Sequence, residues 1–198
     1  WMVERAAAAR DAGLDSLFVG DHHIMPAPYY QNVPMLGRLL AEWDDRPAGC
    51  LFLFPLWNPV LAAEQIGTLA SIARGRFVVQ CALGDGRTQF AGLGVPIKQR
   101  VSRFEEGLDI VRRLLAGERV ESDGRYQVSG ARINPVPPEP VEFWIGGSAE
   151  AAIDRAARLG DGFLASPDLT PEAAARDARL YLERCRAHGK SAAAVALR

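Results

Sequence analysis

The sequence predicts an α/β fold built as a (β/α)8 TIM barrel. Six short β-prone runs alternate with helical patterns, which is typical of a parallel α/β protein. The nearly continuous apolar run 77–83 is typical of a strand buried on both faces of a parallel sheet. Polar or glycine-rich residues follow at least three different strands, at 21–23, 84–87 and 146–148. The C-terminal rim of a barrel collects such loops, whereas an open doubly wound sheet concentrates them at one switch point.

The length of the chain bears on its domain organisation. A TIM barrel usually needs about 250 residues, whereas this chain has 198 and runs from a helical pattern to a strand pattern. We therefore expect residues 1–198 to form a single incomplete barrel domain, with the first strand and the last strand with its helix lying outside the sequence. A β-hairpin is expected to leave the main fold at about 118–134, because Asp123-Gly124 separates two β-prone runs.

The elements of the first half follow from local signals. Glycine or proline marks the helix ends, and aromatic or β-branched residues mark the strands. In order we expect a helix at 2–12, a strand at 15–20, a helix from Pro34 to Trp43, a strand at 48–54 and a helix from the Asn58 cap to Gly75.

The second half predicts three further helices. After the strand at 77–83, a long loop is expected to reach Arg100, and Ser102 with Glu105 forms a capping box at the start of a helix. Ser148 is the expected N-cap of a helix at 149–159, and Thr170 that of a helix ending near His188. The remaining strands are expected at 143–145, from Phe163, and at 193–197.

Composition argues against several classes of partner. Lys and Arg number 23 against 24 acidic residues, so the net charge of −1 provides no field that would gather nucleic acid or anionic membrane. No apolar run reaches about 18 residues, the length that a spanning helix needs. We expect a cytoplasmic protein whose three cysteines, Cys50, Cys81 and Cys185, are reduced core thiols.

Three motifs could carry chemistry, and each has a structural alternative. Asp21-His22-His23 could contact substrate or cofactor or form structural hydrogen bonds; because adjacent side chains of an extended chain point to opposite faces, no metal site is expected. The loop from Gly84 misses the G-x-G-x-x-G pattern at its sixth position, so it is either a flexible turn or a place where Asp85, Arg87 and Gln89 reach a ligand.

The third motif, Gly146-Gly147-Ser148, lies between a strand and a helix. Paired glycines and a hydroxyl at a helix N-terminus suit an anion such as phosphate. The alternative is an ordinary tight turn.

The chain resembles the luciferase-like monooxygenase family of flavin-dependent and F420-dependent oxidoreductases. The resemblance covers nearly the whole chain in consistent order. It is carried by Ala12–His22, Phe54–Pro59, Ala73–Phe77, Cys81–Gly86, Phe90–Pro96, Arg103–Glu106, Gly124–Tyr126, Trp144–Ser148 and Ala156–Gly162.

The resemblance implies a barrel of the luciferase-like type that holds reduced FMN or coenzyme F420 at the strand C-termini. The cofactor phosphate would contact Gly146, Gly147 and Ser148, and the ring would lie beside Leu51, Phe52, Leu53, Ala82, Gly84, Asp85 and Gly86. His22 matches the active-site histidine of F420-dependent dehydrogenases. Arg87 stands where those dehydrogenases carry a catalytic glutamate, and it would hold an anionic group of the substrate or the cofactor tail.

The expected function is therefore hydride transfer or O₂ activation on a small organic substrate. The resemblance also implies a homodimer and a separate flavin or F420 reductase as a partner. Two alternatives stay open at this point: a non-catalytic flavin-binding barrel and a histidine-dependent hydrolase or isomerase.

Overall fold

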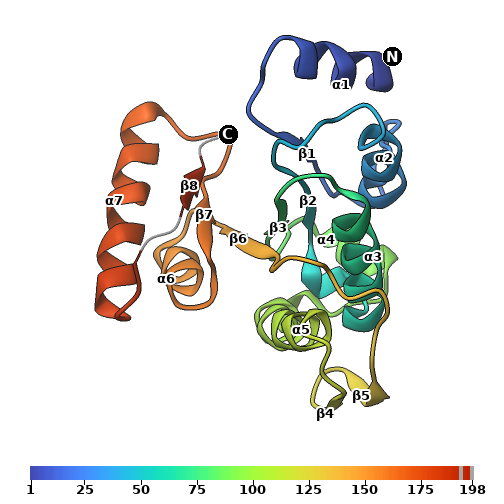
Figure 1. Ribbon diagram of the computed structural model, residues 1–198. Helices are drawn as coiled ribbons and strands as arrows, with labels where there is room; N and C mark the ends of the chain where they lie inside the picture. Colours follow the sequence, from blue (N-terminus) through green and yellow to red (C-terminus); the bar gives the residue numbers. More distant parts are fainter. Residues whose placement is uncertain (192–193, 197–198) are drawn as a thin grey trace. The chain divides into compact units, whose positions relative to one another are not determined.

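A computed structural model of the protein describes residues 1–191 and 194–196 (Figure 1). The chain divides into two compact units, Trp1–Val78 with Leu83–Val141 and Val79–Ala82 with Glu142–Arg198. Strand β3 (Phe77–Cys81) is shared, because its first two residues belong to the first unit and its last three to the second. Among the described residues, no helix is both long and apolar enough to cross a membrane.

The first unit alternates helices with parallel strands before it ends in a hairpin. Its strands run in the order β1-β2-β3. Besides β3, its elements are α1 (Met2–Asp11), β1 (Leu17–Val19), α2 (Asn32–Leu39), β2 (Ala48–Phe52), the 3-10 helix η1 (Phe54–Leu56), α3 (Pro59–Ile72), α4 (Arg87–Gly92), the 3-10 helix η2 (Ile97–Gln99), α5 (Arg100–Leu115), β4 (Val120–Asp123) and β5 (Gln127–Ala131).

The strands of the first unit are buried, as the apolar runs predict. β1 and β2 are parallel, with Leu17 opposite Ala48 and Val19 opposite Cys50. All five residues of β2 and all five of β3 are buried. Burial raises the pKa of the Cys50 thiol, and the nearby Asp21 carboxylate raises it further. This core cysteine therefore stays protonated.

Some helix termini agree with the sequence signals and others do not. Asn58 caps α3, since its side-chain oxygen accepts hydrogen bonds from the N–H groups of Val60 and Leu61. The predicted bounds of α2 were wrong at both ends, because the helix begins at Asn32, with Pro34 in its first turn, and ends at Leu39 instead of Trp43. The capping box at Ser102 was also wrong: α5 already begins at Arg100, directly after η2, and the Ser102 hydroxyl donates to the carbonyl of Gln99.

The hairpin is anchored by one carboxylate of α5. Glu106 accepts hydrogen bonds from the backbone N–H groups of Arg125 (2.7 Å) and Tyr126 (3.0 Å) and from the Ser122 hydroxyl (3.0 Å). Burial alone would raise the pKa of Glu106, but these three donors outweigh it and the pKa is lowered. The antiparallel pair β4-β5 is thereby tied to the main fold over the stretch where Asp123-Gly124 predicts a turn.

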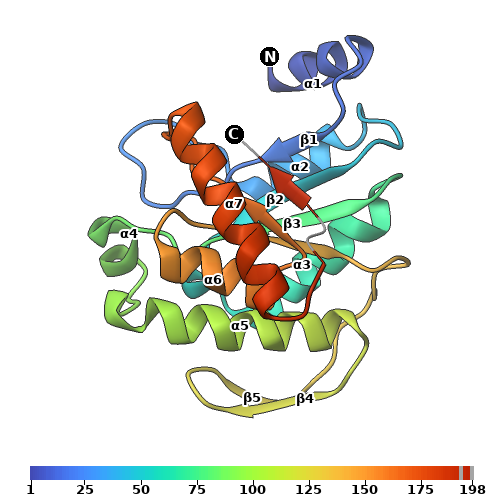
Figure 2. The same cartoon turned by 90° about the vertical axis from the view of Figure 1, so that its left-hand side faces the viewer.

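The second unit continues the parallel pattern. Its strands run in the order β3-β6-β7-β8, and α6 and α7 lie side by side (Figure 2). The expected strand at 193–197 corresponds to β8, although residues 193 and 197 lie outside the described residues. The elements are β6 (Glu142–Gly146), α6 (Glu150–Leu159), β7 (Gly162–Leu164), α7 (Pro171–Ala187) and β8 (Ala194–Ala196).

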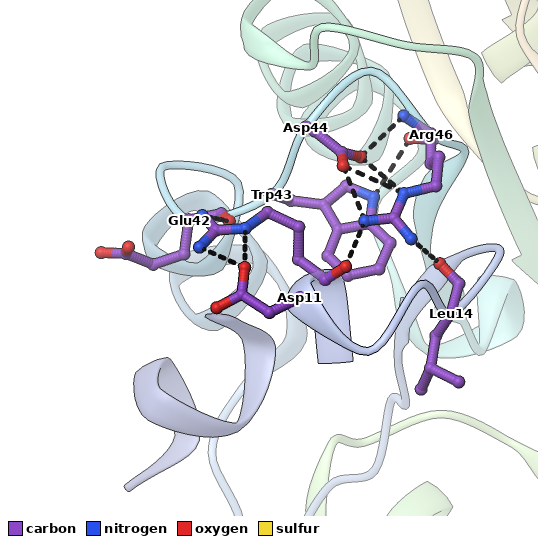
Figure 3. Close-up of polar contacts among 7 residues, drawn as sticks. Asp11, Leu14, Glu42, Trp43, Asp44 and Arg46 are labelled. Atoms are coloured by element: carbon purple, nitrogen blue, oxygen red, sulfur yellow. Dashed lines mark hydrogen bonds and ion pairs between the residues drawn. The ribbon is translucent and has the colours of Figure 1, made fainter. Parts of the chain in front are cut away.

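One arginine of the first unit binds two backbone carbonyls and a carboxylate near α1 (Figure 3). The Arg46 guanidinium binds the Asp44 carboxylate, donates to the Arg10 carbonyl (2.8 Å) and also donates to the Leu14 carbonyl. Its side chain lies over the Trp43 ring at 4.8 Å from the centroid. Arg46 therefore holds the end of α1 and the loop that follows it against the segment that leads into β2.

The Asp44–Arg46 pair makes a prediction about acid stability. The hydrogen bonds from Arg46 lower the pKa of Asp44 to about 2. Since an unfolded aspartate has a pKa of about 3.9, the pair stabilises the folded state above about pH 4, and this contribution disappears as the pH falls through about 2. For Asp44→Asn, we expect a lower urea midpoint than the wild type at about pH 5 and a smaller difference at about pH 2.

The matched control is Glu42→Gln, which removes an exposed ion pair with Arg38 and should change the midpoint less at the same pH. If the urea midpoint of Asp44→Asn differs from that of the wild type by the same amount at about pH 5 and at about pH 2, the charge of Asp44 does not contribute to stability as described.

Candidate functional site

The first candidate site lies directly after β1, where Asp21 is buried. Its Oδ2 accepts two hydrogen bonds, from the backbone N–H of Leu53 at 2.8 Å and from Nε1 of Trp57 at 2.9 Å. These donors come from the segment that follows β2. A buried carboxylate needs such partners, because leaving it unpaired is costly. Asp21 thus joins the ends of two neighbouring parallel strands.

His23 lies on the other side of the same carboxylate. Its Nε2 is 3.2 Å from Oδ1 of Asp21, and its ring meets the Trp57 ring edge-on, with centroids 5.9 Å apart. The backbone N–H of His23 donates to Oε1 of Gln89 at 2.9 Å, and Nε2 of Gln89 donates to the carbonyl of Asp85 at 2.9 Å. Gln89 therefore connects the loop after β1 to the loop after β3.

His22, the histidine that the resemblance singles out, has different neighbours. Its ring lies edge-on to Tyr29 with centroids 5.8 Å apart, and its carbonyl accepts a hydrogen bond from Gln31 at 3.2 Å. The structure thus brings Asp21 together with His23 and not with His22. Within residues 1–191 and 194–196, no group of three or more His, Cys, Asp or Glu side chains is arranged to hold a metal ion.

The segment expected beside the cofactor ring is apolar and buried. Leu51, Phe52 and Leu53 are all buried. The carbonyl of Leu51 accepts a hydrogen bond at 2.7 Å from the fully buried side chain of Asn32. Because Asn32 and Asp21 occupy backbone groups of this segment, its position is fixed on both sides.

The glycine loop after β3 is shorter than expected. Gly84 and Gly86 have φ angles of +69° and +80°, so each turns the chain in a conformation that other residues rarely adopt. Asp85 lies between them and is exposed. The prediction of a long loop to Arg100 was wrong, since Arg87 begins α4. Arg87 itself is exposed.

The second candidate site is the turn from β6 to α6 in the second unit. Gly147 is required there by packing, because a Cβ atom at this position would overlap the Cβ of Ala152 in the first turn of α6. Gly146 lies near Ala82, whose Cβ is 3.7 Å from where a Cβ on Gly146 would stand.

The prediction that Ser148 is the N-cap was wrong. The cap position is held by Ala149, and no side chain bonds to the exposed N–H groups of the first turn. In the described part of the chain, the backbone N–H groups of residues 148–151 donate no hydrogen bond. This turn therefore offers unpaired donors at the positive end of a helix dipole, which can hold an anion.

Sequence reasoning missed the buried polar residues that support these loops. Asn32 gave no signal, because it precedes an apolar stretch and its partner Leu51 is 19 residues away. Asp21 and Gln89 were recognised only as members of polar clusters. Their buried state, which shows that they are structural supports, could not be inferred from spacing alone.

Comparison with known proteins extends over nearly the whole chain. The sequence profile of the family described as luciferase-like monooxygenase matches residues 2–198. An F420-dependent glucose-6-phosphate dehydrogenase of Nakamurella multipartita is 32% identical over 182 residues, which are 86% of this chain and 53% of that protein. The corresponding enzyme of Beutenbergia cavernae is 34% identical over 167 residues, 79% of this chain and 49% of that protein. The chain spans about half the length of the curated relatives it matches.

Solved structures show the same fold. An F420-dependent secondary alcohol dehydrogenase in complex with an F420-acetone adduct matches with a TM-score of 0.87 at 21% identity, covering 98% of this chain and 63% of that one. The FMN-bound oxygenating constituent of 3,6-diketocamphane monooxygenase, a type II Baeyer-Villiger enzyme of Pseudomonas putida, matches with a TM-score of 0.84 at 18% identity, covering 96% and 57%. The predicted fold class is confirmed. The chain belongs to the luciferase-like monooxygenase family.

Proposed function

We propose that the protein is an oxidoreductase that uses reduced FMN or coenzyme F420 for hydride transfer or O₂ activation on a small organic substrate. The observation that carries this proposal is the family match over residues 2–198. It is supported by relatives named as F420-dependent dehydrogenases at 32% and 34% identity. The activities named for these relatives favour an oxidoreductase over the alternative of a histidine-dependent hydrolase or isomerase.

We assign the cofactor phosphate to the turn of Gly146, Gly147 and Ser148. The unused N–H groups of residues 148–151 and the dipole of α6 would attract a phosphate, and an exposed turn lets one approach. Both FMN and F420 carry a phosphate group, so this assignment suits either cofactor.

We assign contacts with the cofactor ring to residues that the sequence already indicated. The apolar segment Leu51–Leu53 would lie beside a planar ring, while Gly84 and Gly86 would let the backbone come close to it. The residues are Leu51, Phe52, Leu53, Ala82, Gly84, Asp85 and Gly86.

His22 and Arg87 would act on the substrate. When bound, the cofactor supplies the redox chemistry, and the protein supplies orientation and exclusion of water. His22 would hold or move a proton at its imidazole, and the exposed Arg87 guanidinium would pair with an anionic group of the substrate or the cofactor tail. We also propose a cytoplasmic homodimer that receives its reduced cofactor from a separate flavin or F420 reductase.

Replacement of His22 by alanine tests this assignment. Because positioned proton transfer contributes about 10²- to 10⁴-fold to a rate, we expect His22→Ala in the full-length protein to lower kcat by at least about 100-fold. The affinity for cofactor, measured by fluorescence titration, should stay within about twofold.

His188→Ala is the control, since His188 pairs with Asp154 on the surface at 3.0 Å and should leave kcat unchanged. An unchanged kcat in His22→Ala would remove His22 from the mechanism. Cofactor binding without turnover in the wild type would instead indicate a non-catalytic binding protein.

A further inference from the structure

The carboxylate of Asp21 is held in one orientation. Its Oδ2 accepts two hydrogen bonds, from Leu53 N–H at 2.8 Å and Trp57 Nε1–H at 2.9 Å. The side chain has no exposed surface. Because both donors bind Oδ2, the other carboxylate oxygen, Oδ1, is the one that faces His23.

The pair formed by Oδ1 and Nε2 of His23 is closed to solvent. The two atoms are 3.2 Å apart, but they are not aligned as in a regular hydrogen bond, and within the described residues neither atom has another hydrogen-bond partner. A carboxylate oxygen has only lone pairs to offer. An unprotonated Nε2 would set a further lone pair against it in a buried place, so the proton belongs on Nε2.

The other ring nitrogen follows from this assignment. A neutral imidazole carries one proton, so Nδ1 of His23 is the acceptor. Nδ1 makes no hydrogen bond to the part of the chain that the structure describes, and the side chain is 15% exposed. The link from His23 N–H through Gln89 to Asp85 fixes the backbone that carries the ring.

We propose that Asp21 is a positioning residue that fixes His23 in the Nε2–H tautomer, so that Nδ1 is presented as an acceptor to an O–H or N–H group of a ligand. This assigns a second imidazole to the rim after β1, beside His22. The assignment of a ligand rests on the proposed function, whereas the tautomer does not.

The variant Asp21→Asn tests the tautomer directly. Leu53 N–H and Trp57 Nε1–H both require an acceptor, so the amide oxygen must take the place of Oδ2. The amide NH₂ group then faces Nε2 of His23, and two donors would oppose each other unless the proton moves to Nδ1. We therefore expect this nearly isosteric change to reverse the tautomer.

The measurement is long-range ¹H–¹⁵N NMR on the full-length protein with labelled histidine, at a pH where the imidazole is neutral. His23→Gln assigns the signals. We expect a protonated Nε2 and a bare Nδ1 in the wild type and the reverse in Asp21→Asn. Asp154→Asn, which changes the exposed pair with His188, should leave the His23 signals unchanged.

Either of two outcomes would overturn the proposal. One is an Nδ1–H tautomer of His23 in the wild type, which the wild-type spectrum alone would show. The other is an Nε2–H tautomer that persists in Asp21→Asn. Turnover gives a separate readout, since Asp21→Asn should lower kcat by at least about 100-fold if Nδ1 takes part in proton transfer. A reversed tautomer with no change in kcat or in KM would overturn the ligand contact alone. A wild type without turnover would count against the proposed function and leave the tautomer assignment standing.

Discussion

Replacing Gly49 by alanine is expected to unfold the first unit or to destabilise it by about 3 kcal/mol or more. Gly49 lies in β2 opposite Phe18 of β1. A Cβ on Gly49 would overlap the carbonyl oxygen of Val78 in β3, and it would stand 2.8 Å from the Val78 carbonyl carbon and 3.0 Å from Cε1 of Phe18. The Val78 atoms are backbone within a strand, so they cannot turn away as a side chain could. The strands would have to separate.

The measurement is urea unfolding, with Gly37→Ala as the matched control. Gly37 lies inside α2, and its Cβ would meet only Cδ2 of Leu69, at 3.8 Å, an ordinary contact. Alanine is favoured over glycine in a helix by up to about 1 kcal/mol, so the control should be as stable as the wild type or more stable. A Gly49→Ala protein that unfolds at the urea concentration of the wild type would contradict the packing described for β1, β2 and β3.

The second large effect is expected at Gly147. In Gly147→Ala the new Cβ would overlap the Cβ of Ala152, so the turn or the first turn of α6 must shift. Overpacking of this kind costs about 1 to 3 kcal/mol. If the turn holds the cofactor phosphate, displacement of its N–H groups should weaken cofactor binding by about tenfold or more.

A compensating change makes this prediction specific. The double variant Gly147→Ala with Ala152→Gly removes the overlap, since the nearest remaining atom of residue 152 is its Cα at 3.6 Å. We expect the double variant to recover most of the affinity, and Ala152→Gly alone to bind as the wild type does while losing about 1 kcal/mol of stability. Failure of the double variant to recover would show that the loss does not arise from this overlap.

The sequence predicted the elements whose signals are local. Strand β3 is recognised because burial on both faces requires a nearly continuous apolar run, although the strand ends at Cys81 and not at residue 83. Asn58 and Thr170 are recognised because a capping side chain bonds to N–H groups two or three residues away, and both bonds are present. The turn at Gly146-Gly147 is recognised for a related reason, since β6 and α6 flank it directly.

Other features depend on contacts between distant segments. Ser102 and Ser148 have the residue types of caps, yet the cap position of α5 falls three residues early, at Gln99 in η2, and the cap position of α6 falls one residue late. The partners of Asp21 are 32 and 36 residues away, so no local pattern distinguishes it from a catalytic or a surface carboxylate. Asp21 and His23 are only two residues apart and can share one face of an extended chain, but the sequence does not show which of the two histidines contacts the carboxylate.

Equilibrium titration of the full-length protein with F420, FMN and riboflavin, followed by absorbance and fluorescence, tests directly whether the turn after β6 binds the phosphate of a redox cofactor. We expect saturable binding of F420, FMN or both, at least about tenfold weaker binding of riboflavin than of FMN where FMN binds, and weaker binding of the phosphorylated cofactor by Gly147→Ala. Equal affinities for riboflavin and FMN together with an unaffected Gly147→Ala variant, or no binding of F420 and FMN at all, would contradict the claim that the turn after β6 holds the phosphate of a redox cofactor.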